Sequence, residues 1–314
     1  MKAEVEAMRQ DSPDRLQRQA IVFCLLTGAI WGFGFIATSQ SLSAFGAFQV
    51  LLIRFAGAAA LAWIPVLTNR KSITRQSLTR GVVCGLFLFG AFALQTLGLD
   101  LTEAGSNAFF TSANVVLVPF LAWAVFRKPP ALRQFGACLL CFAGIGLMGW
   151  TAGGFSLRTG DLLSLGCALL FACHIVSLQW AAGQDPDVIN AIQMSVAALL
   201  SAVPGLSVRW PAHPGLLPVL SLVYLIAGST WLAFWLQTRA QEHLEASRAS
   251  LLLATESLWA NLFAVIFLKE RLSPAMAAGG LLILTAVYLT EQPASVRKTA
   301  STTEPPSAAQ TEEP

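Results

Sequence analysis

The sequence predicts an all-α integral membrane protein with ten transmembrane helices, built as two inverted five-helix repeats. The composition, the alternation of apolar runs with short polar breaks, and an internal repeat support this prediction. Of the 314 residues, 55% are hydrophobic and only 12% are charged, whereas an ordinary soluble domain carries about 25% charged residues. Such a chain would expose too much apolar surface in water, so the composition predicts a lipid environment.

The apolar runs have the length that a bilayer requires. A spanning helix needs about 20 mostly apolar residues. The first run lacks an Ala-x-Ala cleavage pattern, so we expect a retained helix and not a removed signal peptide. The runs predict ten helices, at residues 20–41, 45–67, 81–101, 105–126, 134–151, 160–182, 188–206, 216–239, 246–268 and 273–291.

The same pattern divides the chain into two repeats and two tails. We expect a polar cytoplasmic tail at residues 1–18, a first repeat at 19–151 and a second repeat at 160–291. Residues 292–314 are rich in Pro, Ser, Thr, Ala and Glu and cannot bury enough apolar surface to fold. We therefore expect them to form a disordered cytoplasmic tail.

Lys and Arg are unevenly distributed among the connections. Fifteen of the 20 fall in the tails and connections on one side of the predicted helices, four fall on the other side, and Arg54 lies inside a helix. Cytoplasmic loops of membrane proteins carry an excess of Lys and Arg. The distribution predicts an even number of spans, with both termini in the cytoplasm.

An internal repeat relates the two halves. Residues 91–104 read AFALQTLGLDLTEA and residues 233–246 read AFWLQTRAQEHLEA, with seven identities in fourteen positions at an offset of 142. The same offset aligns Asn114 with Glu256. Five helices per repeat is an odd number, so the halves must have opposite orientations in the membrane. Inverted repeats of this kind are typical of secondary transporters, with the substrate site between the halves, although a duplication kept only for folding stays open.

The sequence resembles the drug/metabolite transporter superfamily, specifically its ten-helix EamA-type exporters. The resemblance rests on Trp31-Gly32, Arg54, residues 106–119 and the segment TESLWANLFAVIFLKERLSP at 255–274. In this chain Ser257 follows Glu256, where the family often has proline, so we expect the second half to lack a helix break there. The resemblance implies secondary export of amino acids or other small metabolites across a bacterial inner membrane. No ATP-binding G-x-x-x-x-G-K-[ST] loop is present.

Three ionisable residues lie near the centres of predicted helices: Arg54, His174 and Glu256. An ionised side chain there costs about 2.5–3.5 kcal/mol on insertion scales, so it persists when it is paired or faces water. Arg54 is a candidate for a substrate carboxylate, because a guanidinium binds a carboxylate through two parallel hydrogen bonds. Glu256 is a candidate for a substrate amine or a coupling proton. A structural pair is the alternative for both, and a packed, hydrogen-bonded histidine is the alternative for His174.

Further candidates come from polar and aromatic residues of the predicted helices. Thr111 and Asn114 share a helical face with Asn107, which indicates either a substrate path or polar contacts between helices. Gln95 and Gln237 are equivalent in the repeat and are candidate path residues near opposite faces. Gly28, Gly32 and Gly34 lie around Trp31 and would permit close helix packing or bending of that helix. Three deep tryptophans are candidate cavity walls, with ordinary packing as the alternative: Trp31, Trp235 and Trp259.

These observations predict a multi-pass transporter of the cell inner membrane that exports small metabolites, amino acids or related amphipathic solutes, by alternating access. A membrane-embedded enzyme and a receptor or scaffold are the alternatives, and the sequence has neither an H-E-x-x-H nor a G-x-S-x-G pattern. We expect no enzyme activity, cofactor, metal, disulfide or nucleic-acid partner. The expected partners are a small-molecule substrate and the bilayer, with protons an open candidate for the coupling ion.

Overall fold

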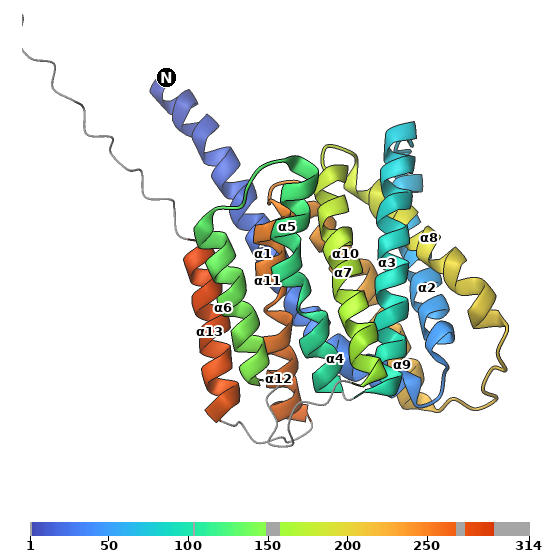
Figure 1. Cartoon of the computed structure of the whole chain (residues 1–314). Coiled ribbons are helices and arrows are strands. Elements are labelled where there is room, and N and C mark those ends of the chain that lie inside the picture. Colours follow the sequence, from blue (N-terminus) through green and yellow to red (C-terminus); the bar gives the residue numbers. More distant parts are fainter. Residues whose placement is uncertain (1, 103, 149–157, 268–273, 292–314) are drawn as a thin grey trace, which may run out of the picture.

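The computed structural model describes residues 2–102, 104–148, 158–267 and 274–291, and these residues form an all-helical bundle (Figure 1). Helices of the first half are α1 (Lys2–Leu42), α2 (Ala47–Thr68), α3 (Arg75–Leu101), α4 (Ala104–Thr111), α5 (Asn114–Phe126) and α6 (Leu132–Met148). Those of the second half are α7 (Thr159–Ala181), α8 (Pro186–Leu206), α9 (Leu216–Tyr224), the π-helix η1 (Leu225–Leu232), α10 (Ala233–Ala240), α11 (Ala246–Leu253), α12 (Glu256–Phe267) and α13 (Pro274–Glu291).

These elements combine into ten membrane-crossing units. Among the described residues, eight helical segments, each made of one to three consecutive elements, are long and apolar enough to span a bilayer, and two shorter apolar helices lie at Leu132–Leu147 and Pro274–Thr290. The predicted fold class is thereby confirmed. The backbone of α1 is helical from Lys2 onward, so the helix continues through the predicted polar tail. The predicted disordered tail at 292–314 lies outside the described residues.

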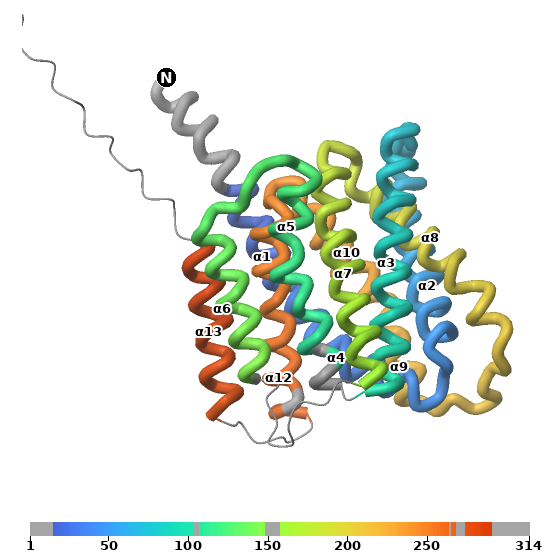
Figure 2. Tube along the Cα trace, viewed as in Figure 1, coloured from blue at the N-terminus to red at the C-terminus, as the bar shows by residue number. Residues whose placement is uncertain are grey.

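The two halves run in opposite directions. In Figures 1 and 2, α1 descends from the N-terminus at the top of the view, whereas α7, the equivalent helix of the second half, rises from the bottom. Equivalent helices of the two halves make equivalent contacts. α2 packs on its counterpart α8, and α6 packs on its counterpart α13. α3 packs on α7, and in the same way their counterparts, α9–η1–α10 and α1, pack on each other. This pattern is consistent with inverted repeats. We call the end of the bundle where the membrane-crossing part of α1 begins the N-terminal end, and the other end the opposite end.

Both halves contain a helix break at the same repeat position. α4 ends at Thr111 and α5 begins at Asn114, while α11 ends at Leu253 and α12 begins at Glu256. The second break arises without proline, so the expectation that Ser257 removes it is wrong. Short-range hydrogen bonds close the turn instead, because the Thr255 hydroxyl donates to the Leu252 carbonyl at 2.7 Å and the Ser257 N–H donates to the Ala254 carbonyl at 3.3 Å.

Close packing against α1 holds the second break in place. A Cβ atom added to Gly28 would lie 2.6 Å from Thr255 Oγ1, and one added to Gly32 would lie 2.7 Å from Trp259 Cβ and 2.8 Å from the Ala260 nitrogen. Real Cβ atoms do not approach so closely, so glycine lets α1 contact the backbone around the break. The predicted close packing of these glycines is confirmed.

Replacing Gly32 with alanine tests this contact. We expect Gly32→Ala to lower the free energy of unfolding by about 1–3 kcal/mol, because overpacking a dense interface forces backbone shifts. Gly136→Ala in α6 is the matched control, since an added Cβ there meets no atom within 4 Å. Thermal unfolding of both variants in one detergent measures the difference. Equal or higher stability of Gly32→Ala relative to the control would contradict the packing described.

Candidate functional site

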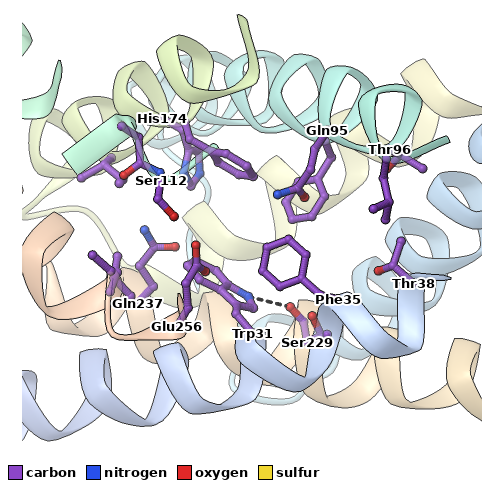
Figure 3. A pocket seen from close by; sticks show the side chains of 18 of the residues that line it. Trp31, Phe35, Thr38, Gln95, Thr96, Ser112, His174, Ser229, Gln237 and Glu256 are labelled. Atoms are coloured by element: carbon purple, nitrogen blue, oxygen red, sulfur yellow. Dashed lines mark hydrogen bonds between the residues drawn. The ribbon is translucent and has the colours of Figure 1, made fainter. Parts of the chain in front are cut away.

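A cavity of about 790 Å³, counting the part continuous with solvent, lies between the two halves. Its wall combines aromatic rings with hydroxyl, amide and charged groups, and it includes residues of both helix breaks. In Figure 3 the wall follows α1 from Trp31 through Phe35 to Thr38, toward the opposite end of the bundle. The lining residues are Trp31, Gly34, Phe35, Thr38, Arg54, Phe92, Gln95, Thr96, Leu99, Ser112, Asn114, Phe171, His174, Ile175, Ser229, Gln237, Leu253, Ala254 and Glu256.

Arg54 on α2 is the cation of this cavity. Its side chain is almost fully buried, and its Nε donates a hydrogen bond of 3.0 Å to the Thr230 hydroxyl. Its Cζ atom lies 4.3 Å from the centroid of the Phe92 ring and 5.6 Å from that of Phe55. Aromatic faces attract a cation but do not neutralise it. Within the part of the chain that the structure describes, no carboxylate pairs with Arg54.

Glu256 is the anion of the cavity. It is the first residue of α12, directly after the second break, where the partial positive charge of a helix N-terminus favours a carboxylate. Figure 3 shows its side chain directed into the cavity, on the side where Gln237 and Ser112 lie. No hydrogen bond or ion pair joins its carboxylate to any described residue.

The two helix breaks meet at this point. The hydroxyls of Ser112 in the first break and Ser257 in the second lie 3.1 Å apart. Asn114 begins α5 as Glu256 begins α12, and both line the cavity. The inverted halves thus place an amide and a carboxylate at equivalent positions of one cavity.

Four further predicted residues line the cavity: Trp31, His174, Gln95 and Gln237. The Trp31 Nε1 donates to the Ser229 carbonyl at 2.9 Å (Figure 3). His174 combines two of the predicted roles, because it lines the cavity while its Nε2 lies 2.9 Å from Oε1 of Gln193. Figure 3 places Gln95 and Gln237 at different depths along the cavity, Gln237 nearer the N-terminal end.

The other three predicted residues lie elsewhere. Thr111 ends α4 with its hydroxyl 3.9 Å from the Cys167 sulfur of α7, the helix that Asn107 also contacts through Ser164. The helix break after Thr111 separates these two residues from Asn114, which begins α5. Trp235 packs against Phe23 and donates to Asp187. Trp259 packs on α1 and stacks on an aromatic ring of its own helix. None of the three is a lining residue.

Comparison with known proteins agrees with this architecture. The EamA-like transporter family matches residues 18–150 and again residues 158–291.

The chain belongs to the EamA-like transporter family.

Proteins similar to this chain include an uncharacterized transporter of Archaeoglobus fulgidus, 29% identical over 265 residues that cover 84% of this chain and 83% of that protein. The uncharacterized transporter YwfM of Bacillus subtilis is 28% identical over 286 residues, which cover 84% of this chain and 93% of YwfM. A solved structure titled "Crystal structure of protein" has a TM-score of 0.74 at 19% identity and covers 87% of this chain and 96% of its own. The family consists of transporters and not of enzymes, so the chain is a membrane transporter.

The sequence did not predict one segment of the cavity wall, the π-helix η1. The π-helix η1 contains Ser229 and Thr230, which accept hydrogen bonds from Trp31 and Arg54. π-helical segments are rare and frequently lie at functional sites. The available signal was the run Gly228-Ser229-Thr230 inside an apolar span, but polar residues in a span do not show which helix they face.

Thr230→Val tests how Arg54 is held in this transporter. Valine has nearly the same shape but no acceptor, so the buried guanidinium loses its one described hydrogen bond. We expect a loss of about 1–3 kcal/mol of stability, measured by thermal unfolding in detergent, and recovery in Thr230→Ser. Thr285→Val is the matched control, because the Thr285 hydroxyl is exposed and bonds only to Leu281 of its own helix. Identical unfolding of Thr230→Val and the control would contradict the assigned role.

Proposed function

We propose that this transporter exports small amphipathic metabolites, amino acids or related zwitterions, across the bacterial inner membrane by alternating access. One observation carries the proposal: Arg54 and Glu256 line one cavity, and neither has a partner of opposite charge among the described residues. A buried charge without a partner is costly in the membrane. A solute that brings both a carboxylate and an ammonium group would satisfy both residues at once.

The rest of the wall suits the apolar part of such a solute. Trp31, Phe35, Phe92 and Phe171 supply aromatic surface between the two charges and their polar neighbours. Binding sites for small molecules typically combine a mostly apolar wall with a few placed polar groups. In this proposal Arg54 binds the carboxylate through its terminal nitrogens, Glu256 binds the amine, and the rings contact the side chain of the solute.

Alternating access requires that the cavity opens to one side at a time. The lining residues Thr38 and Leu99 lie close to the C-terminal ends of α1 and α3, so the cavity extends toward the opposite end of the bundle. We place the N-terminal end in the cytoplasm because most Lys and Arg residues lie at that end. A substrate that binds the outward-open and inward-open states with different affinity shifts their populations.

Two substitutions test the proposed roles of the charges. Arg54→Lys keeps the charge but loses the planar guanidinium that can form two parallel hydrogen bonds to a carboxylate. We expect efflux to fall at least tenfold, because the loss of one charge-assisted hydrogen bond weakens substrate binding by about that factor. Glu256→Gln removes the negative charge and should abolish proton-linked export if a proton is the coupling ion. Efflux is measured with a panel of amino acids and other metabolites, in cells without their own exporters and at matched protein levels.

Matched controls are Arg75→Lys and Glu245→Gln, since both side chains are exposed outside the cavity. The controls should export at the wild-type rate. Wild-type efflux by Arg54→Lys and Glu256→Gln would show that these charges are structural and that the assignment is wrong.

A further inference from the structure

An ion cluster centred on a buried carboxylate lies at the N-terminal end of the bundle, and its charged residues do not line the cavity. Its centre is Asp187, the second residue of α8, whose side chain is 5% exposed. The Asp187 carboxylate accepts hydrogen bonds from Lys71 Nζ at 2.5 Å, from Arg239 at 3.0 and 3.1 Å, and from Trp235 Nε1 at 2.9 Å. Three donors on one buried carboxylate form a strong, specific contact.

The cluster joins segments that are far apart in the sequence. Lys71 lies in the α2–α3 connection of the first half, Asp187 begins α8, and Trp235 and Arg239 lie on α10. Lys71 also bonds Asp185 at 2.9 Å. The Arg239 Cζ atom lies 4.4 Å from the Trp235 ring centroid, and that ring packs against Phe23 of α1. The cluster therefore ties together both halves of the protein.

The helix α10 connects the cluster to the cavity wall. On α10, Gln237 lies two residues after Trp235 and two residues before Arg239. Gln237 lines the cavity, whereas Trp235 and Arg239 do not. None of Lys71, Asp185 and Asp187 lines it either. Gln237 lies toward the N-terminal end of the cavity (Figure 3), so the cluster includes α10 residues within two positions of that part of the wall.

The equivalent positions of the other half carry no carboxylate. The repeat aligns Trp235 with Ala93 and Arg239 with Leu97. Asp185 is the N-cap of α8 as Gly46 is the N-cap of α2, so Asp187 corresponds by helix position to Phe48. An inverted repeat would place an equivalent gate at the opposite end of the bundle. Counted from the helix C-cap, Lys71 corresponds to Arg209, but the positions equivalent to Asp185, Asp187 and Arg239 are glycine or apolar. These described residues therefore form no counterpart of the ionic contact at the opposite end.

We propose that Lys71, Asp187 and Arg239 form a one-sided ionic gate, which holds the N-terminal end of the transport path closed and sets the outward-open state as the resting state. Separation of these three residues is then a required step when the cavity opens to that end. This step belongs to a transport cycle, so the gate proposal rests on the proposed transport function.

The location of the gate makes such a step accessible. Lys71 lies outside the spanning helices, and its side chain is 21% exposed. Burial lowers the pKa of Lys71, but the hydrogen bonds and charges of Asp187 and Asp185 outweigh burial and raise that pKa above its ordinary value. The ammonium therefore stays charged at neutral pH. Water at the end of the bundle can hydrate the separated charges, which the hydrocarbon core could not do.

Distance measurements on the full chain in lipid nanodiscs, without substrate, test the gate. Spin labels replace the exposed residues Thr79 and Glu245 at the N-terminal end, and a second pair replaces the exposed residues Ser39 and Asp100 at the opposite end, both in a background without the native cysteines. We expect Lys71→Gln and Asp187→Asn to raise the population with an open N-terminal end by at least about tenfold, since removing one partner of a buried ion pair is strongly unfavourable for the closed state.

The opposite-end distance should shorten in the same variants, because the two ends open in alternation. Lys71→Arg should retain the wild-type distances. Lys128→Gln, an exposed lysine at the same end of the bundle, is the matched control and should also retain them. If Asp187→Asn does not fold, Lys71→Gln in the loop decides the test alone.

Two results would overturn the gate. Unchanged distances at the N-terminal end in folded Lys71→Gln would show that the contact does not hold that end closed. Widening of the first distance without shortening of the second would show that the cluster only stabilises the fold. Since no substrate is present, these outcomes are separate from the efflux results for Arg54 and Glu256.

Discussion

The hydrocarbon core of the bilayer offers no hydrogen-bond partner, and the arrangement of this protein depends on that constraint. Each polar group inside the spanning helices must find a partner in the bundle or face a water-filled cavity. Arg54 reaches Thr230, the His174 ring reaches Gln193, and the Asn107 amide donates to Ser164 at 2.9 Å. Glu256 has no such partner among the described residues and lies at the cavity. The Glu256 carboxylate is thus available to a solute.

Interrupted helices supply the remaining polar surface of the cavity. The breaks after Thr111 and Leu253 and the π-helix η1 all lie at the cavity wall, where unpaired backbone groups are tolerated. Because the repeats are inverted, the two breaks meet at Ser112 and Ser257. The ion cluster at the N-terminal end, where Asp187 bonds Lys71 and Arg239, does not follow this symmetry. A symmetric scaffold with an asymmetric closure is a simple way to favour one of two otherwise equivalent states.

Hydropathy and the internal repeat predicted the helices and the equivalence of the two halves, because both depend on the order of residues along the chain. Hydropathy placed the ten helices, and the repeat offset of 142 placed Asn114 and Glu256 at equivalent positions of the same cavity. The second break was missed because the expectation relied on proline, whereas hydrogen bonds from Thr255 and Ser257 and the approach of Gly28 produce the turn. The partners of Arg54 and Asp187 were missed because they lie 176 and up to 116 positions away. Hydropathy does not show which helix faces meet over such separations.

The central claim is that the cavity is a path open to one side of the membrane at a time. A single cysteine at Gln95, a half-buried lining residue, tests it in a background without the native cysteines. Proteoliposomes of known orientation are treated with a membrane-impermeant thiol reagent on either side. The account predicts rapid modification from the side of the opposite end and slower modification from the N-terminal side. It also predicts that the slower reaction is accelerated by Lys71→Gln, without any ion leak. Modification from neither side, or a leak that accompanies modification from both sides, would contradict the account.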